Sequence, residues 1–263
     1  MKSLKRWGVL FAFAAVAVAQ TPGSTTSFAL PQLAFGGGWY TAIYFNNRTN
    51  GALSTNVFYF DQNGQPLPTP TLASSIFGSG LAADLSVADT VTVSTSTTVN
   101  VPPLGTAIIE VPDSGSLQQG WTRVDVPAGM VGYGVFRYSL SVPGQPAQLS
   151  EGLIPFASTS STFSSLVFDD TAYVTSVAFA NPSGVAATIN IRALNAAGQV
   201  IGTATQTLGA GARTAIVLRT VPGLESVAGQ RGAVEFSTTT GAVSVLGLRF
   251  NNLTFTSILP STN

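Results

Sequence analysis

Carboxylates are the side chains of this protein that can transfer protons near neutral pH, because the sequence contains no histidine and no cysteine. The same absences exclude zinc sites of the Cys/His kind, Ser-His-Asp and Cys-His nucleophiles, haem ligation by His or Cys, and disulfide bonds. Glycoside hydrolysis by carboxylates alone needs two acids about 5 to 9.5 Å apart across a cleft. The acids considered for that role are scattered and fall mostly in predicted turns: Asp61, Glu110, Asp113, Glu151, Asp169, Asp170 and Glu235.

No two of these acids are placed face to face by their spacing, so we predict no catalytic residue and a protein that is not an enzyme. A carboxylate-only glycoside hydrolase stays as the weakest alternative. Asp169 and Asp170 could help to hold calcium, but an oxygen cage takes about 6–8 ligands. We therefore predict no metal site and no cofactor.

Aromatic residues form the strongest candidate for a binding site. On two neighbouring predicted strands, Tyr40, Tyr44, Phe58 and Phe60 fall on the face opposite to the predicted core. Together they would make a platform for stacking sugars or a patch for a protein partner, with Arg48 at its rim. The alternative is that an insertion or the other half of the chain covers them.

Two arginines recur at matching places in the sequence, Arg137 and Arg249. Each could act as a fork for a carboxylate or for sugar hydroxyls. The interpretation that we favour is structural: each stem packs on its sheet, because two copies of one fold need the same support but not the same ligand.

The first 19 residues have the organisation of a signal peptide. Lys2, Lys5 and Arg6 precede the apolar run from Gly8 to Ala19, which ends in Ala-Val-Ala. A bilayer needs about 20 apolar residues, so this run is too short to span one. We expect an exported protein that is secreted, held at the cell surface or left in the periplasm, with no membrane span in the mature chain.

The charge balance changes when that segment is removed. The sequence has 11 basic and 11 acidic residues, and three of the basic ones lie in the leader, which leaves eight arginines and no lysine. No run of like charge remains, so we predict no nucleic-acid partner. Extracellular polysaccharide and cell-surface protein are the partners that we consider.

An internal repeat is the strongest pattern in the sequence. The segment from Trp39 to Asn47 matches the segment from Tyr173 to Asn181, and the turn Asp61–Gln65 matches Asn195–Gln199 at the same offset. Later matches have shorter offsets, so the first copy carries an insertion at about 69–96. This insertion could be a flap near a binding face or an additional hairpin.

Each copy consists of short segments that alternate apolar with polar residues, separated by turns rich in Gly, Pro and Asn, which is typical of strands. About six to eight short strands per copy fit an immunoglobulin-like sandwich. We therefore predict an all-β protein with two tandem immunoglobulin-like β-sandwich domains after a cleaved signal peptide. The predicted boundaries are 1–19 for the leader, 20–29 for a flexible mature N-terminus, 30–157 for module 1 and 162–263 for module 2.

Three segments resemble a module that recurs in exported proteins of environmental bacteria: Leu30–Thr41, Phe60–Leu67 and Gly132–Arg137. The resemblance covers nearly the whole mature chain, and it is closer in the first copy than in the second. It implies an uncharacterised β-sandwich module of the cell exterior and transfers no catalytic residue.

These observations favour a non-enzymatic exported protein that mediates attachment or assembly at the cell exterior. The alternative is a carbohydrate-binding module that uses the outer aromatic face of module 1.

Overall fold

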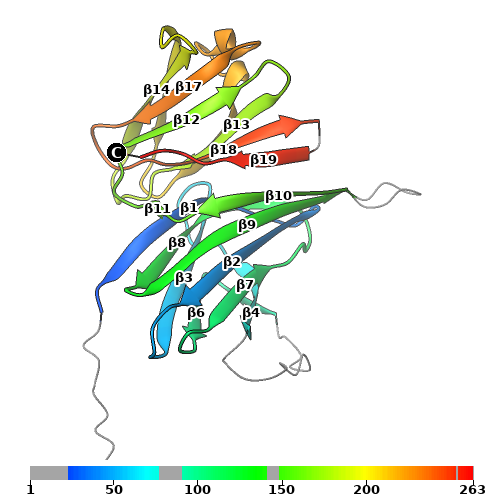
Figure 1. Ribbon diagram of the computed structural model, residues 1–263, viewed down its shortest axis with the longest axis vertical. Coiled ribbons are helices and arrows are strands. Elements are labelled where there is room, and N and C mark those ends of the chain that lie inside the picture. Colours follow the sequence, from blue (N-terminus) through cyan, green and yellow to red (C-terminus); the bar gives the residue numbers. More distant parts are fainter. Residues whose placement is uncertain (1–22, 77–90, 141–147, 253, 263) are drawn as a thin grey trace, which may run out of the picture.

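The computed structural model describes residues 23–76, 91–140, 148–252 and 254–262, which form antiparallel strands and two short 3-10 helices (Figure 1). The predicted all-β class is confirmed. The predicted signal peptide lies outside the described residues. Strand β1 begins at Thr25, inside the segment 20–29 that we expected to be flexible. In the described ranges, no helix is long and apolar enough to cross a membrane.

The first half of the chain forms two antiparallel sheets that share one core. The five-stranded sheet has the order β11 (Ala157–Ser158), β1 (Thr25–Phe35), β8 (Gln118–Pro127), β3 (Leu53–Asp61) and β6 (Ser96–Val101). The six-stranded sheet has the order β10 (Gln148–Pro155), β9 (Met130–Leu140), β2 (Trp39–Asn47), β7 (Thr106–Val111), β4 (Thr69–Ile76) and β5 (Thr92–Ser94).

The second half forms two four-stranded sheets around a core of its own. The outer sheet has the order β12 (Phe163–Asp169), β17 (Arg231–Ser237), β14 (Ala187–Asn195) and β15 (Val200–Leu208). The inner sheet has the order β16 (Arg213–Val217), β13 (Val174–Ala180), β18 (Ser244–Asn251) and β19 (Thr254–Ile258). The 3-10 helices are η1 (Leu218–Thr220) and η2 (Glu225–Val227).

The repeat is visible in the hydrogen bonds of two matched positions. Asn47 is fully buried and its amide donates to three backbone carbonyls, and Asn181 makes the same kind of contacts. Asp61 accepts two backbone N–H groups in its turn, and Asn195 does likewise. Both halves therefore use the same polar anchor and the same turn.

The two arginines predicted to match are not equivalent in the structure. Thr41 pairs with Phe136, and its counterpart Thr175 pairs with Arg249. The structural counterpart of Arg249 is therefore Phe136, and Arg137 points to the opposite face. Since side chains alternate between faces, a shift of one residue in the alignment reverses the face of every residue in the strand.

The same shift decides which core each face of β18 belongs to. If Arg249 matched Arg137, then Leu246, Leu248 and Phe250 would face the core of the second half. Leu246 and Leu248 instead pack with the core of the first half, while Val245 belongs to the core of the second half. Strand β18 is thus buried on both faces, because the inner sheet lies between the outer sheet and the first half (Figure 1).

The insertion forms a hairpin where it is described. Strand β4 pairs with β7 on one side and with β5 on the other, the latter through Thr69–Ser94, Pro70–Val93 and Thr71–Thr92. Its described ends therefore follow the hairpin alternative, and residues 77–90 lie outside the described residues.

Candidate binding surface

The outer side of the six-stranded sheet, which we call the tyrosine face, is the strongest candidate for a contact surface. Its centre is made of β2 and β9, where Tyr44 pairs with Tyr133 and Tyr40 pairs with Arg137. The alternate residues of β2, Ile43 and Phe45, are buried in the core. Because successive side chains point to opposite faces, burial of the latter residues places the tyrosines outside.

The four aromatic residues of the predicted platform do not lie together. Tyr40 and Tyr44 are on β2 of the six-stranded sheet, whereas Phe58 and Phe60 are on β3 of the five-stranded sheet. The predicted platform requires that strands next to each other in sequence are also neighbours in one sheet. Here β2 and β3 belong to opposite sheets, so their outer faces point away from each other.

Phe58 and Phe60 have local partners on the five-stranded sheet. The guanidinium carbon of Arg123 lies 4.2 Å from the ring centre of Phe58. Phe60 stacks on Trp121 with ring centres 4.6 Å apart, in a small cluster with Ala180 of the second half. The alternative that the other half covers part of the platform therefore applies to Phe60.

Tyr133 takes the place that the two phenylalanines were expected to fill. Its ring centre is 5.1 Å from that of Tyr44 with an angle of 17° between the planes, and 43% of the residue is exposed. Tyr133 does not stand out in the sequence, because the sequence alone does not identify the strand that pairs with β2. Pairing β2 with the aromatic strand β9 would have identified it.

A hollow of about 490 Å³ opens beside the two stacked rings. Its volume falls in the range of about 300–1,000 Å³ that is usual for ligand pockets. The lining is mainly apolar, with polar groups at one end, and the residues are Tyr44, Phe45, Asn46, Thr106, Ile108, Val131, Gly132 and Tyr133.

Arg48 follows β2 directly and is exposed at that end of the sheet. Its backbone N–H donates to the carbonyl of Gly129 over 2.9 Å. Asn46 and Val131, which line the hollow, form the pair before the last one at this end. Arg48 thus follows Asn46 by two residues, and its role at the rim of a binding surface stays a prediction.

Polar contacts cross four strands of the tyrosine face. The Tyr40 hydroxyl donates to Glu110, the Arg137 guanidinium lies 5.2 Å from the Tyr40 ring centre, and Arg137 pairs with Glu151 at 2.9 Å. Burial raises the pKa of Tyr40 well above its ordinary value, and the hydrogen bond to Glu110 and its charge add to the rise. This hydroxyl therefore stays neutral and acts as a hydrogen-bond donor.

Exposed apolar side chains lie on the same face of the sheet as the tyrosine pair. Val131 is 43% exposed on β9, and Leu149 and Leu153 are 62% and 38% exposed on the edge strand β10. Strand pairing places Leu153 opposite Val135 and Leu149 opposite Ser139, on the outer side. Val131 and Leu153 therefore lie close to the tyrosine pair, whereas the Arg137–Glu151 ion pair separates Leu149 from it. Exposed apolar side chains near aromatic rings mark interaction sites on many proteins.

The two acids considered for calcium hold structural partners instead. Asp170 accepts the backbone N–H of Thr175 at 2.7 Å and pairs with Arg219. Asp169 pairs with Arg231, and its pKa is lowered chiefly by the hydrogen bond from the Thr171 hydroxyl. Within the described part of the chain, no group of three or more metal-ligating side chains comes together.

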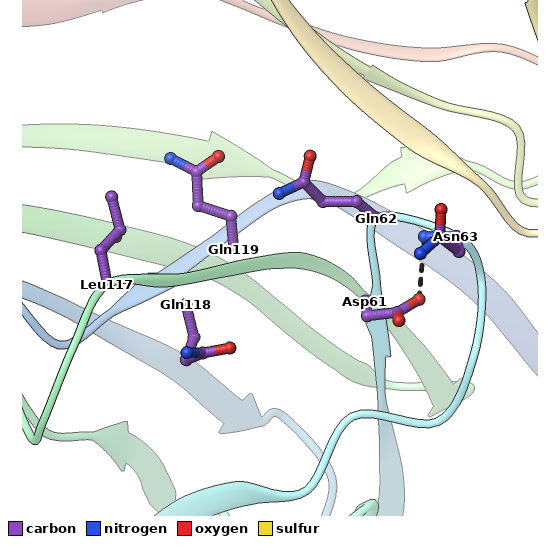
Figure 2. A pocket seen from close by; sticks show the side chains of 6 residues that line it. All are labelled: Asp61, Gln62, Asn63, Leu117, Gln118 and Gln119. Carbon is purple, nitrogen blue, oxygen red and sulfur yellow. Dashed lines mark hydrogen bonds between the residues drawn. The ribbon is translucent and has the colours of Figure 1, made fainter.

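Another hollow, of about 430 Å³, lies where Asp61 meets the start of β8 (Figure 2). Figure 2 shows the Asp61 carboxylate bonded to the backbone N–H of Asn63, which is the turn contact of 2.8 Å described above. Four amide side chains line this hollow with one carboxylate: Gln62, Asn63, Gln118, Gln119 and Asp61. It lacks a second acid for general acid–base catalysis.

No known protein family and no curated protein matches the chain. Among solved structures, a glycosyl hydrolase family 2 member from Bacteroides cellulosilyticus aligns with 88% of this chain at 9% identity and a TM-score of 0.17. The chain spans 26% of the length of that protein. A likeness this low carries no argument about fold or activity.

Proposed function

We propose that the chain is an exported, non-enzymatic protein that acts in assembly or attachment at the cell exterior through the tyrosine face. In this proposal the two halves are tandem immunoglobulin-like β-sandwich modules. The observation that supports it best is the stacked pair of Tyr44 and Tyr133, which lies among exposed apolar side chains on a sheet face.

The occupant that we propose for the tyrosine face is a second copy of this chain. The hollow is mainly apolar, so it suits an apolar side chain better than the hydroxyl groups of a sugar. One cation, Arg137, lies between Glu151 and the Tyr40–Glu110 pair, so the face carries both signs of charge. Two such faces related by a two-fold axis can exchange these ion pairs.

Sedimentation velocity of the mature chain over a range of concentrations tests this proposal. We expect a reversible dimer that Val131→Asp weakens by about tenfold or more, because the substitution buries a charge in the contact. Val167→Asp is the matched control, since Val167 is 73% exposed on β12 of the outer sheet. A protein that stays monomeric at every concentration, or an equal loss in both variants, would overturn the self-assembly proposal.

Carbohydrate recognition at the same face is the second candidate, and the aromatic pair beside a hollow favours it. Its distinguishing result is a monomeric protein that binds polysaccharide and loses this binding with Tyr133→Ala. In the stacked pair, one face of each ring is covered by the other ring, so less ring surface is open to a sugar. For that reason we place self-assembly first.

A further inference from the structure

The outer side of the outer four-stranded sheet carries a third hollow. This sheet lies at the opposite end of the molecule from β2 and β9 of the tyrosine face (Figure 1). The volume of the hollow is about 780 Å³. Strand alternation explains its polar lining, because Ile189, Ile191 and Ala193 of β14 point into the core and the residues between them point out. We call this hollow the polar groove, lined mainly by Phe163, Asn190, Arg192, Thr203, Thr205, Glu235 and Ser237.

Strand pairing arranges these side chains in two rows across the sheet. One row runs from Thr205 through Asn190 and Ser237 to Phe163. The other row runs from Thr203 through Arg192 to Glu235. Neighbouring strands are about 4.8 Å apart, so a row across four strands spans roughly 14 Å, the length of a short oligosaccharide.

Arg192 and Glu235 form the centre of the groove and leave matched hydrogen-bonding groups free. Both Nε and Nη2 of Arg192 contact the same carboxylate oxygen, Oε2 of Glu235, at 2.7 and 2.6 Å. In the described part of the chain, Nη1 of Arg192 and Oε1 of Glu235 make no hydrogen bond. The pair thus keeps one free donor and one free acceptor.

A free donor and a free acceptor on one ion pair can bind two hydroxyl groups of a sugar. One hydroxyl accepts from Nη1 of Arg192 and the other donates to Oε1 of Glu235, and both bonds are strengthened by charge. The amide of Asn190 and the hydroxyl of Thr205 extend this pattern along the next row. Phe163 supplies an aromatic surface at the end of that row, against which the apolar side of a sugar ring can pack.

We propose that the polar groove binds a neutral oligosaccharide through its hydroxyl groups. The ligand is neutral because the charges of Arg192 and Glu235 balance, and an acidic sugar would meet the Glu235 carboxylate. Glu235 is the one carboxylate of the groove lining, so the pair of acids that glycoside hydrolysis requires is missing there. The groove therefore retains the sugar without cleaving it.

Isothermal titration calorimetry with neutral hexasaccharides of glucose and of mannose tests the proposal on the mature chain. We expect binding to at least one of them, weakened about tenfold or more by Arg192→Met, by Glu235→Gln and by Phe163→Ala. Thr207→Ala is the matched control, because Thr207 is exposed on the same strand and face as Thr205 but outside the groove lining. Urea unfolding of each variant separates loss of binding from loss of folding.

Three results would overturn the proposal: no binding of any neutral hexasaccharide, preferential binding of polygalacturonate, or equal loss in Thr207→Ala. Arg192→Lys refines the test, since lysine keeps the charge but lacks the fork, and we expect it to bind as weakly as Arg192→Met. Val131→Asp, which tests the tyrosine face, should leave sugar binding unchanged. The two proposals can therefore fail independently.

Discussion

Arg213 of the second half donates from Nη1 to the side-chain oxygen of Gln119 in the first half, over 3.2 Å. Its Nη2 donates to Gln32, and its Nε has no partner. Arg213 is only 3% exposed, and in the described residues no carboxylate lies within ion-pair distance of it. A buried cation thus joins the halves through two neutral amides.

This charge is an energetic cost at the junction. Burial lowers the pKa of Arg213, which shows that its surroundings disfavour the charged form. We expect Arg213→Met, which keeps most of the side-chain volume, to change the free energy of unfolding by no more than about 1 kcal/mol. In that variant the side-chain oxygen of Gln32 loses its donor, Nη2 of Arg213. Adding Gln32→Met removes this unpaired oxygen, so the double variant should have a larger free energy of unfolding in urea than the wild type.

Arg213→Ala provides the comparison, because it removes the charge and leaves a cavity, so it should cost about 2 kcal/mol or more. A loss of that size in Arg213→Met as well would contradict the prediction. It would mean that the guanidinium stabilises the junction more than its burial costs.

The matched asparagines Asn47 and Asn181 are expected to be the polar residues that stability depends on most. Each is fully buried, its amide donates to three backbone carbonyls, and its Oδ1 accepts the backbone N–H of Thr49 or Ser183. Replacing either by alanine removes all of these hydrogen bonds, at about 1–3 kcal/mol for each buried group that is left unsatisfied. We expect each variant to lose about 3 kcal/mol or more in urea unfolding.

Asn100→Ala is the control for both variants, since Asn100 is exposed on β6. It should change the unfolding free energy by less than about 0.5 kcal/mol. If Asn47→Ala is costly and Asn181→Ala is not, the two anchors are not energetically equivalent and this part of the repeat argument is wrong.

The strand class and the turns followed from local patterns in the sequence. The alternation of residues in β2 identified its buried face, because the large apolar residues Ile43 and Phe45 recur at every second position. The turn at Asp61 was evident because Asn63 and Gly64 suit a tight reversal, and Gly64 has a positive φ of 80°. These features depend on neighbours in sequence, so they needed no knowledge of the fold.

The candidate site was predicted only in part, because it depends on which strands pair. Tyr40 and Tyr44 were placed on the correct outer face, but Phe58 was assigned to the same surface although β3 belongs to the other sheet. Tyr133 was missed for the same reason. The predicted match between Arg137 and Arg249 is wrong because the two strands are aligned with an error of one residue. Identical residues in the sequence do not reveal this error, whereas the pairing of Thr175 with Arg249 does.

Alkaline pH should destabilise the protein through its buried tyrosines. Burial raises the pKa of Tyr59 well above its ordinary value of 10.0, and its hydroxyl donates to Thr97 over 3.0 Å. Above pH 10 the unfolded chain therefore releases a proton that the folded chain keeps, so ionisation favours unfolding. We expect the stability to be lost as the pH rises, by up to about 1.4 kcal/mol per pH unit for this residue.

Urea unfolding of Tyr59→Phe from about pH 9 to about pH 11 measures this effect. The variant should lose about 1 kcal/mol at neutral pH with its hydrogen bond, but its stability should fall less steeply above pH 10 than that of the wild type. Thr97→Val is the control, because it removes the acceptor and keeps the buried phenol, so it should retain the full alkaline decline. Parallel declines in wild type and Tyr59→Phe would show that Tyr59 ionises as readily in the folded chain as in the unfolded one, which its complete burial in the core opposes.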